Sequence, residues 1–207
     1  MSPLSRRAFA TAVAATLLVG CGGPGPHRTA DPGSGSARPP APAPAKAARA
    51  LARSVPVRLR IPAIGVDTPV MRLGLAPDGT VQVPPITAHD RAGWYQHSPT
   101  PGQVGPSVIL GHVTVGAYGD GVFRHLAGLH RGDRIETSLE NGTTAVFTVR
   151  AVRTVAKADF PVDDVYGNVD RPELRLVTCG GPRTGDGYLD NVIVFGALSA
   201  EPKPPHP

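Results

Sequence analysis

The sequence predicts an all-β fold, and three observations support that expectation. The chain of 207 residues contains 25 Gly and 24 Pro but only 5% aromatic residues, a composition typical of turn-rich β proteins and unlike helical bundles. Its apolar residues occur in short runs, each bounded by turn-forming residues. About eight such runs with little helix indicate a closed β-barrel or a sandwich.

The predicted domain covers residues 55–200, and its strands follow one another along the chain. The expected strands are Val57–Ile61, Thr68–Leu73, Thr80–Val83, Ser107–His112, Asp133–Leu139, Thr143–Val149, Glu173–Cys179 and Tyr188–Ala197. Pro77-Asp78-Gly79 and Glu140-Asn141-Gly142 are hairpin signals, because Asp-Gly and Asn-Gly adopt positive φ at little cost. The strongest helical turn is expected at Val122–Leu129.

Charge and motif content exclude several classes of function. Residues 55–200 hold 13 Lys and Arg against 14 Asp and Glu, so the domain offers no basic stripe to a nucleic acid. The surplus positive charge lies in the tails, where it suits an anionic lipid or wall polymer. The sequence has no Cys-x-x-Cys, no His-Glu-x-x-His and no phosphate-binding glycine loop, so we expect no metal ion and no cofactor.

The first 21 residues have the pattern of an export signal. A basic start precedes an apolar stretch, Ala8–Val19, that is too short to span a bilayer comfortably. Ser5–Phe9 resembles a twin-arginine signal, although Arg pairs also occur in general secretory signals. Leu18-Val19-Gly20-Cys21 resembles a bacterial lipobox, in which the Cys becomes the lipidated N-terminus. We therefore expect an exported protein, lipid-anchored through Cys21 at the outer face of the membrane; the alternatives are a plain signal peptide and a retained N-terminal anchor.

Two further segments lack the apolar residues that a core requires. Residues 22–54 are rich in Pro, Gly, Ala and Ser, which predicts a disordered linker. Within it, Arg38–Lys46 favours an extended, polyproline-like geometry that holds the domain away from the membrane. The tail at residues 201–207 is expected to be disordered as well.

A lone thiol stands at the end of an expected strand, in the stretch RLVTCGG at residues 175–181. If Cys21 carries lipid, Cys179 has no intramolecular partner. An unpaired thiol in an exported protein is either buried as a small hydrophobic residue or retained for its reactivity. Gly180 and Gly181 allow another segment to approach this position closely.

A reactive thiol needs a base or a cation nearby, and among the seven His residues His112 is the best placed. It ends the apolar run that begins at Ser107 and directly follows Gly111, whereas the other His residues lie in the tails or in polar turns. Two strand-end groups of complementary chemistry suggest a His–Cys pair across neighbouring strands. The alternative is a core histidine satisfied by a backbone carbonyl.

Five stretches of the domain carry a resemblance: IPAIGVDTPV, GWYQHSPTPGQVGPSVILGHV, GVFRHL, LRLVTCGG and YLDNVIVFGAL. Together they are similar to sortases, in particular to the class F type of high-GC Gram-positive bacteria. The resemblance implies an eight-stranded sortase-type β-barrel and cysteine transpeptidase chemistry. Its substrates would be surface proteins with a C-terminal LPXTG-like sorting signal, cleaved at Thr through a thioacyl intermediate. The acyl group would pass to an amine acceptor such as a peptidoglycan precursor.

The resemblance also assigns roles to residues. Cys179 would be the nucleophile, His112 the general acid, and Thr178 would help to shape the site for the substrate carbonyl. Sortases place a catalytic Arg at the start of the last strand, but alignment on VIVFG puts Asn191 at that position. Asn donates a hydrogen bond without positive charge. Arg183, in the loop GGPRTGDGY, either supplies that charge from the side or is a solvated loop cation.

Two other functions stay open at this point. A sortase-like barrel weakened by the loss of its Arg would act as a lipoprotein that binds a peptide or wall polymer. A different cysteine enzyme of the wall, such as an L,D-transpeptidase, would carry its nucleophile in a His-Gly-Cys-like context, which this sequence lacks.

We expect the mature protein to begin at a lipid-modified Cys21, because the lipobox ends there and the apolar stretch before it is short. Mass spectrometry of the N-terminal peptide from the membrane fraction measures this directly. Cys21→Ser, which leaves the rest of the signal intact, should lose the lipid and the membrane association. An unmodified terminus, or retention of residues 1–20, would contradict the expectation.

Overall fold

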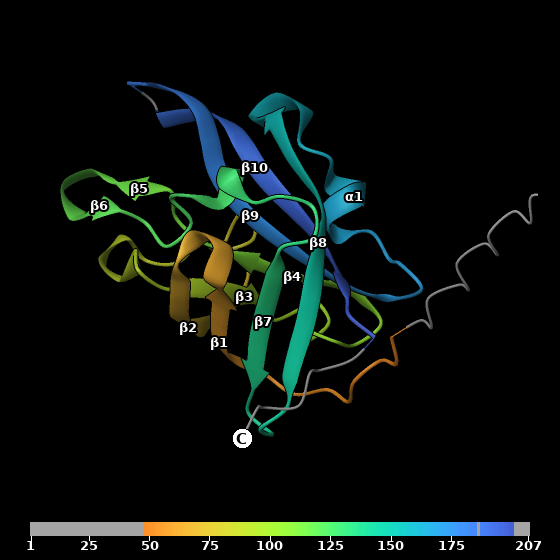
Figure 1. Ribbon diagram of the computed structural model, residues 1–207. Coiled ribbons are helices and arrows are strands. Elements are labelled where there is room, and N and C mark those ends of the chain that lie inside the picture. Colours follow the sequence, from red (N-terminus) through yellow and green to blue (C-terminus); the bar gives the residue numbers. More distant parts are fainter. Residues whose placement is uncertain (1–47, 186, 201–207) are drawn as a thin grey trace, which may run out of the picture. The chain divides into compact units, whose positions relative to one another are not determined.

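The computed structural model describes residues 48–185 and 187–200 (Figure 1). Eight strands form a closed barrel in the order β1-β2-β3-β4-β9-β10-β8-β7, which confirms the predicted all-β barrel. The barrel strands are β1 (Pro56–Ile61), β2 (Val66–Leu73), β3 (Ala92–Tyr95), β4 (Gly105–Leu110), β7 (Arg134–Leu139), β8 (Thr144–Ala156), β9 (Pro172–Thr184) and β10 (Gly187–Leu198).

The remaining elements are short and lie outside the barrel wall. The two-stranded ribbon consists of β5 (Thr114–Val115) and β6 (Gly119–Asp120). The helical elements are the 3-10 turns η1 (Pro62–Ile64), η2 (Ile86–Ala88), η3 (Gly116–Tyr118), η4 (Leu126–Gly128) and η5 (Lys157–Asp159) and the α-helix α1 (Val162–Tyr166). None of the helices in this described part of the chain is long and apolar enough to cross a bilayer.

Two strand pairs of the barrel are parallel, namely β2 with β3 and β4 with β9. The other pairs are antiparallel, and β1 closes the barrel against β7. Parallel neighbours require a long crossover connection, and residues 111–171 provide it between β4 and β9. The C-terminal end of β4 therefore lies beside Val177, and β9 continues beyond it to Thr184, paired with β10.

Apolar side chains pack on both sides of the barrel wall. The interior core includes Trp94, Ile109, Phe123, Leu174, Leu176, Val192 and Val194. A second group, which we call the outer cluster, packs on the outer face and includes Leu73, Val108, Leu110, Val165, Val177 and Ile193. Strands β4, β9 and β10 are apolar on both faces because α1 and the segment before it cover their outer side.

One expected strand is wrong and one barrel strand was not expected. Residues 80–83 contribute a single bridge, between Leu75 and Val81, because β2 pairs with β3 instead and the Pro84-Pro85 pair ends any further pairing. The barrel strand at Ala92–Tyr95 is short and contains Gly93, both of which weaken a strand pattern. Gly93 is required there, since a Cβ would collide with the Leu73 side chain.

The two hairpin signals are confirmed, but the strand end predicted at Cys179 is wrong, because β9 continues through Gly180-Gly181 to Thr184 in its pairing with β10. Gly79 (φ 82°) and Gly142 (φ 81°) adopt the positive φ that the two hairpin signals predicted. The helical turn expected at residues 122–129 narrows to the 3-10 turn η4, and the five-residue helix α1 was not expected. Of the predicted linker only residues 48–54 are described, where the Leu51 N–H donates to the Gly102 carbonyl at 2.8 Å. The signal segment with Cys21, residues 22–47 and the tail lie outside the described residues.

Candidate active site

Cys179 lies on the outer face of β9. Leu176 belongs to the interior core and Val177 to the outer cluster, and side chains alternate along a strand. Thr178 therefore faces the barrel interior and Cys179 the outside. The Cys179 thiol is free and half-buried, so it is open to a molecule bound on that face.

His112 lies in line with Cys179. In the parallel pair of β4 and β9, Leu110 stands opposite Val177, and the Gly111 N–H extends the ladder by donating to the Val177 carbonyl at 3.2 Å. β4 ends at Leu110, so His112 lies just beyond the paired strand; the same register continued to His112 would put it next to Cys179, and neighbouring strands are about 4.8 Å apart. Residues distant in the sequence are thus neighbours at one edge of the barrel.

The glycines next to these two residues allow the interior core to reach the edge. A Cβ added at Gly111 would lie 2.6 Å from Phe123 Cδ2, and one added at Gly180 would lie 2.6 Å from Val192 Cγ2. Phe123 and Val192 are buried in the interior core. The expected close approach at Gly180 is therefore made by the neighbouring strand β10.

A backbone carbonyl orients the His112 ring. His112 Nε2 lies 2.6 Å from the Pro84 carbonyl oxygen. Because a carbonyl only accepts hydrogen bonds, Nε2 carries the hydrogen and donates it. In the neutral ring Nδ1 is then the atom without a hydrogen, and in the imidazolium it holds the second one. A carbonyl partner of this kind fixes both tautomer and ring orientation, as it does for histidines that bind metals.

Asn191 completes a row of three polar side chains on the outer face. It stands opposite Cys179 in the antiparallel pair of β9 and β10. One step down the same face, Leu110, Val177 and Ile193 form a parallel row across the three strands. All three belong to the outer cluster, so the polar row lies at the border of a water-excluding apolar surface.

Thr178 is engaged within the fold. The residue is 4% exposed, and its hydroxyl donates to the Gly111 carbonyl at 2.8 Å. This bond ties β9 to the residue directly before His112. Thr178 thereby holds the two strand ends that carry the thiol and the imidazole together.

Arg183 lies further along β9, beyond a β-bulge. It is exposed and stands opposite Tyr188, with its Cζ 5.9 Å from the centre of the Tyr188 ring. Tyr188 is three residues from Asn191 along β10, an odd number that puts their side chains on opposite faces. The Tyr188 hydroxyl shares a 2.8 Å hydrogen bond with Thr114 Oγ1. Arg183 therefore stacks on the face turned away from Asn191.

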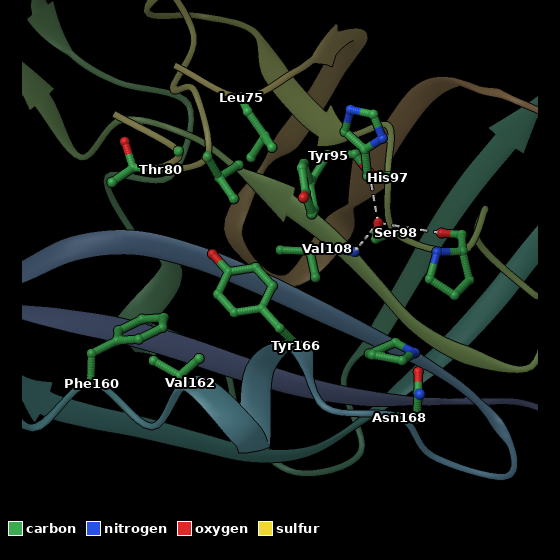
Figure 2. Close-up of a pocket in the computed structure, with 14 residues that line it drawn as sticks. Leu75, Thr80, Tyr95, His97, Ser98, Val108, Phe160, Val162, Tyr166 and Asn168 are labelled. Atoms are coloured by element: carbon green, nitrogen blue, oxygen red, sulfur yellow. Dashed lines mark hydrogen bonds between the residues drawn. The ribbon is translucent and has the colours of Figure 1, made fainter. Parts of the chain in front are cut away.

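A cavity of 660 Å³ opens along the outer face of β3 and β4 (Figure 2). Its lining includes Leu75, Tyr95, Val108, Phe160, Val162 and Tyr166. The Tyr95 and Tyr166 rings meet edge-on, 6.2 Å apart. Val108 is four residues before His112, or about 13 Å along the strand. An extended peptide bound in the cavity would therefore reach Cys179 within about four residues.

Several contributors to this site have no sequence signal that points to them. The Pro84 carbonyl and the Tyr188–Thr114 bond are contacts between segments far apart in the chain. The aromatic lining draws on two segments far apart in the chain, at residues 95–97 and 160–166. Within residues 48–185 and 187–200, no three or more His, Cys, Asp or Glu side chains come together as ligands of a metal ion would.

An accessible thiol aligned with an imidazole at the edge of a β-barrel, next to a peptide-sized cavity, defines a cysteine-dependent acyl-transfer enzyme. Residues 59–199 match the sortase domain family. The chain belongs to the sortase family, and sortases are cysteine transpeptidases.

Solved structures agree with this assignment. Sortase C-1 from Actinomyces oris is 23% identical, with 69% of this chain and 72% of that chain covered and a TM-score of 0.53. A lid mutant of sortase A from Corynebacterium diphtheriae is 19% identical, covers 74% of both chains and has a TM-score of 0.56. A sortase D5 transpeptidase from Clostridium perfringens is 24% identical, with coverage of 70% and 79% and a TM-score of 0.52. At these identities the likeness shows the shared fold, across sortases A, C and D. A search of curated proteins gives no match.

We expect Tyr166 to ionise above the ordinary tyrosine range, which is about 10. Burial, reinforced by Tyr95, raises its pKa. Because the fold favours the neutral phenol, the folded state loses stability as pH rises above the ordinary tyrosine value. In an alkaline titration followed by phenolate absorbance, Tyr166→Phe should lose the component that titrates at the highest pH. The free energy of unfolding of this variant should also fall less steeply with rising pH than that of the wild type. An ordinary tyrosine pKa for the lost component would show that water reaches Tyr166.

Proposed function

We propose that this protein cleaves an LPXTG-like sorting signal at Thr and transfers the acyl fragment to an amine of the cell wall. The observation that carries the proposal is the alignment of His112 with Cys179 at one end of the outer cluster, which extends through Val108 to the aromatic cavity. The residues before the scissile bond would lie along this cluster. Their first side chain would occupy the cavity, about four residues from the thiol.

The reaction follows from the row of side chains. The Cys179 thiolate attacks the Thr carbonyl carbon and forms a C–S bond and an oxyanion. The oxyanion collapses, the C–N bond breaks, and His112 gives its proton to the departing amine. An acceptor amine then attacks the thioester, His112 takes the proton that this amine loses, and the thiolate leaves. The products are a new amide and the regenerated enzyme.

Asn191 is the residue best placed to stabilise the oxyanion. Its side chain is on the face of Cys179 and stands directly opposite it in the ladder. Stabilisation by a side-chain amide is worth most beside an apolar surface, where water does not compete. Arg183 supplies a positive field from the distal part of the same β9–β10 hairpin rather than through a direct contact. Thr178 contributes by holding Gly111 and so the strand end that carries His112.

The class and location are part of the same proposal. The stretches LRLVTCGG and YLDNVIVFGAL favour a class F sortase. A lipid at Cys21, followed by a Pro-rich segment, would hold the enzyme at the outer face of the membrane. Its partners there would be surface proteins with C-terminal sorting signals and an amine such as a peptidoglycan precursor. A peptide-binding barrel without catalysis is the competing function, favoured only by Asn191 in place of Arg.

Cys179→Ala should abolish cleavage of an LPXTG-like peptide while the fold survives, because the change removes one sulfur from a half-open position. His112→Ala should lower turnover by about 10²–10⁴-fold, the usual contribution of a general acid. Peptide cleavage followed by mass spectrometry, with melting temperature as the control, measures both. Near wild-type turnover in Cys179→Ala would refute the nucleophile. A loss below about tenfold in His112→Ala would reduce that residue to a structural role. Peptide binding without turnover in the wild type would favour the non-catalytic barrel.

Asn191→Ala should slow formation of the acyl-enzyme by roughly 10²-fold, the lower bound for loss of an oxyanion donor. Arg183→Ala should have a smaller effect, because Arg183 stacks on Tyr188 on the opposite face. Rapid-quench measurement of acyl-enzyme on Cys179 compares the two variants. The reverse order, with a harmless Asn191→Ala and a severe Arg183→Ala, would transfer the oxyanion role to Arg183.

A further inference from the structure

The connection between β8 and β9, residues 157–171, has little of its own to hold its shape. Its helix α1 has five residues and no side-chain hydrogen bond at its N-cap, Pro161. Helices of this length are unstable in isolation. Val165 is its buried residue and belongs to the outer cluster. Contacts with the barrel must therefore fix the path of this segment.

Arg175 provides such a contact from the outer face of β9. Its side chain is 4% exposed, and its Nε donates to the Asp164 carbonyl at 2.9 Å. That carbonyl belongs to the last turn of α1, where helix carbonyls need partners from outside the helix. Arg175 Nη2 donates to Glu173 Oε2 at 2.6 Å, so the buried charge is paired.

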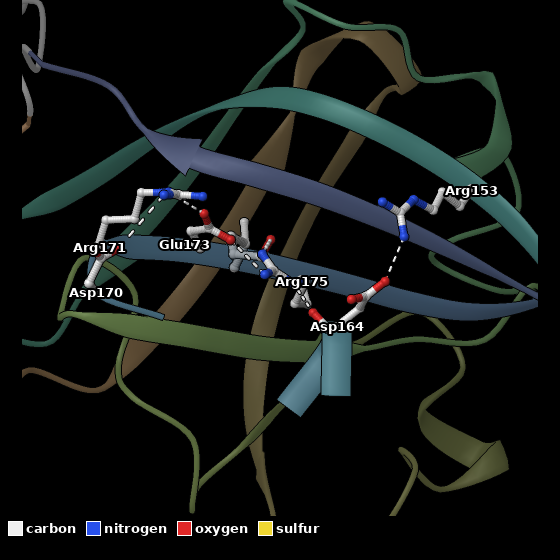
Figure 3. Close-up of polar contacts among 7 residues, drawn as sticks. Arg153, Asp164, Asp170, Arg171, Glu173 and Arg175 are labelled. Carbon is white, nitrogen blue, oxygen red and sulfur yellow. Dashed lines mark hydrogen bonds and ion pairs between the residues drawn. The ribbon is translucent and has the colours of Figure 1, made fainter. Parts of the chain in front are cut away.

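Arg153 holds the same residue from the other side of β10 (Figure 3). Its Nη1 donates to Asp164 Oδ2 at 2.7 Å. The Cζ atoms of Arg153 and Arg175 each lie 4.7 Å from the centre of the Phe195 ring. Since Arg153 comes from β8 and Arg175 from β9, guanidinium groups from two strands reach the Phe195 ring of β10, the strand between them. Arg153 bonds to the side chain of Asp164, and Arg175 bonds to its backbone carbonyl.

The other side of the connection lines the cavity. Phe160, Val162 and Tyr166 belong to its lining, and Tyr166 meets Tyr95 of β3 edge-on. Asp164 lies two residues from both Val162 and Tyr166. The position of Asp164 therefore determines where this wall of the cavity stands relative to β3 and β4.

We propose that Arg153 and Arg175 are positioning residues for peptide recognition: they hold Asp164, and thereby set the wall formed by Phe160, Val162 and Tyr166. This inference rests on the proposed function. Arg175 lies four residues before Cys179 on β9, about 13 Å away, too far to touch the reacting atoms. Loss of either Arg weakens peptide binding and leaves the reactivity of the thiol intact.

The test compares Arg153→Gln and Arg175→Lys with a matched control, Arg58→Gln. The Arg58–Asp67 pair resembles the Arg153–Asp164 pair, with N–O distances of 2.6 and 2.7 Å and side-chain exposures of 49%/48% and 51%/53%, but it lies on β1 and β2.

Affinity for an LPXTG-like peptide is measured by calorimetry in the Cys179→Ala background. We expect Arg153→Gln to weaken binding roughly two- to fivefold, as loss of an exposed ion pair allows. Arg175→Lys keeps the charge but loses the planar fork, and should cost on the order of tenfold. Arg58→Gln should change nothing.

Two readouts separate positioning from general damage. Alkylation of Cys179 by iodoacetamide, in proteins that retain the thiol, should proceed at the wild-type rate in all three variants. Hydrogen exchange should accelerate at residues 160–168 in the Arg153 and Arg175 variants and nowhere else. Unchanged peptide affinity in both, slower alkylation, or exchange that rises throughout the barrel would overturn the positioning role. If the Cys179→Ala protein binds no such peptide at all, the proposed substrate fails, and the exchange pattern alone decides whether the two Arg residues hold the connection.

Discussion

The parallel pairing of β4 with β9 is the constraint on which the site depends. β4 ends beside Val177 of β9, so the register of this pairing brings His112 towards Cys179 although 67 positions separate them. Parallel neighbours also require a long crossover. Between His112 and Pro172 the chain therefore adds β7 and β8 to the far side of the barrel sheet and then forms the connection that makes one wall of the cavity. A single pairing sets the chemistry and supplies part of the recognition surface.

The second requirement is a sheet that is apolar on both faces. On the interior side of the sheet, the Phe123 and Val192 side chains lie so close to Gly111 and Gly180 that a Cβ at either position would collide with them. On the outer side, the row of Leu110, Val177 and Ile193 keeps water from the base of the polar row. A thiol and an imidazole beside such surfaces interact with few competing waters, which strengthens the hydrogen bonds and charges that a thioacyl reaction needs.

Sequence reasoning succeeded where structure is dictated locally and failed where it depends on distant contacts. The hairpins at Gly79 and Gly142 follow from nearby residues, whereas the end of the strand predicted at Cys179 is wrong, because pairing with β10 carries β9 on through Gly180 to Thr184. The in-line position of His112 needed one assumption, that the two strands are neighbours. The strand Ala92–Tyr95 and the Pro84 carbonyl bonded to His112 depend on which segments the barrel brings together, and no local pattern encodes that. In the sequence Arg175 is a charged residue within an apolar run, and only the folded structure reveals its partners, Asp164 and Glu173.

The reactive residues and the cavity wall are held in place by different kinds of contact. Cys179 and Asn191 sit within continuous backbone ladders, and His112 follows one, so their geometry changes only if the barrel itself changes. The cavity wall at residues 160–166 depends instead on one buried apolar residue and a few side-chain bonds to Asp164. Under the proposed function, substitutions in that segment can alter which peptide fits while the row at the barrel edge stays as it is. Arg153 and Arg175, which both bond to Asp164 and lie over the ring of Phe195 on β10, join these two parts of the molecule.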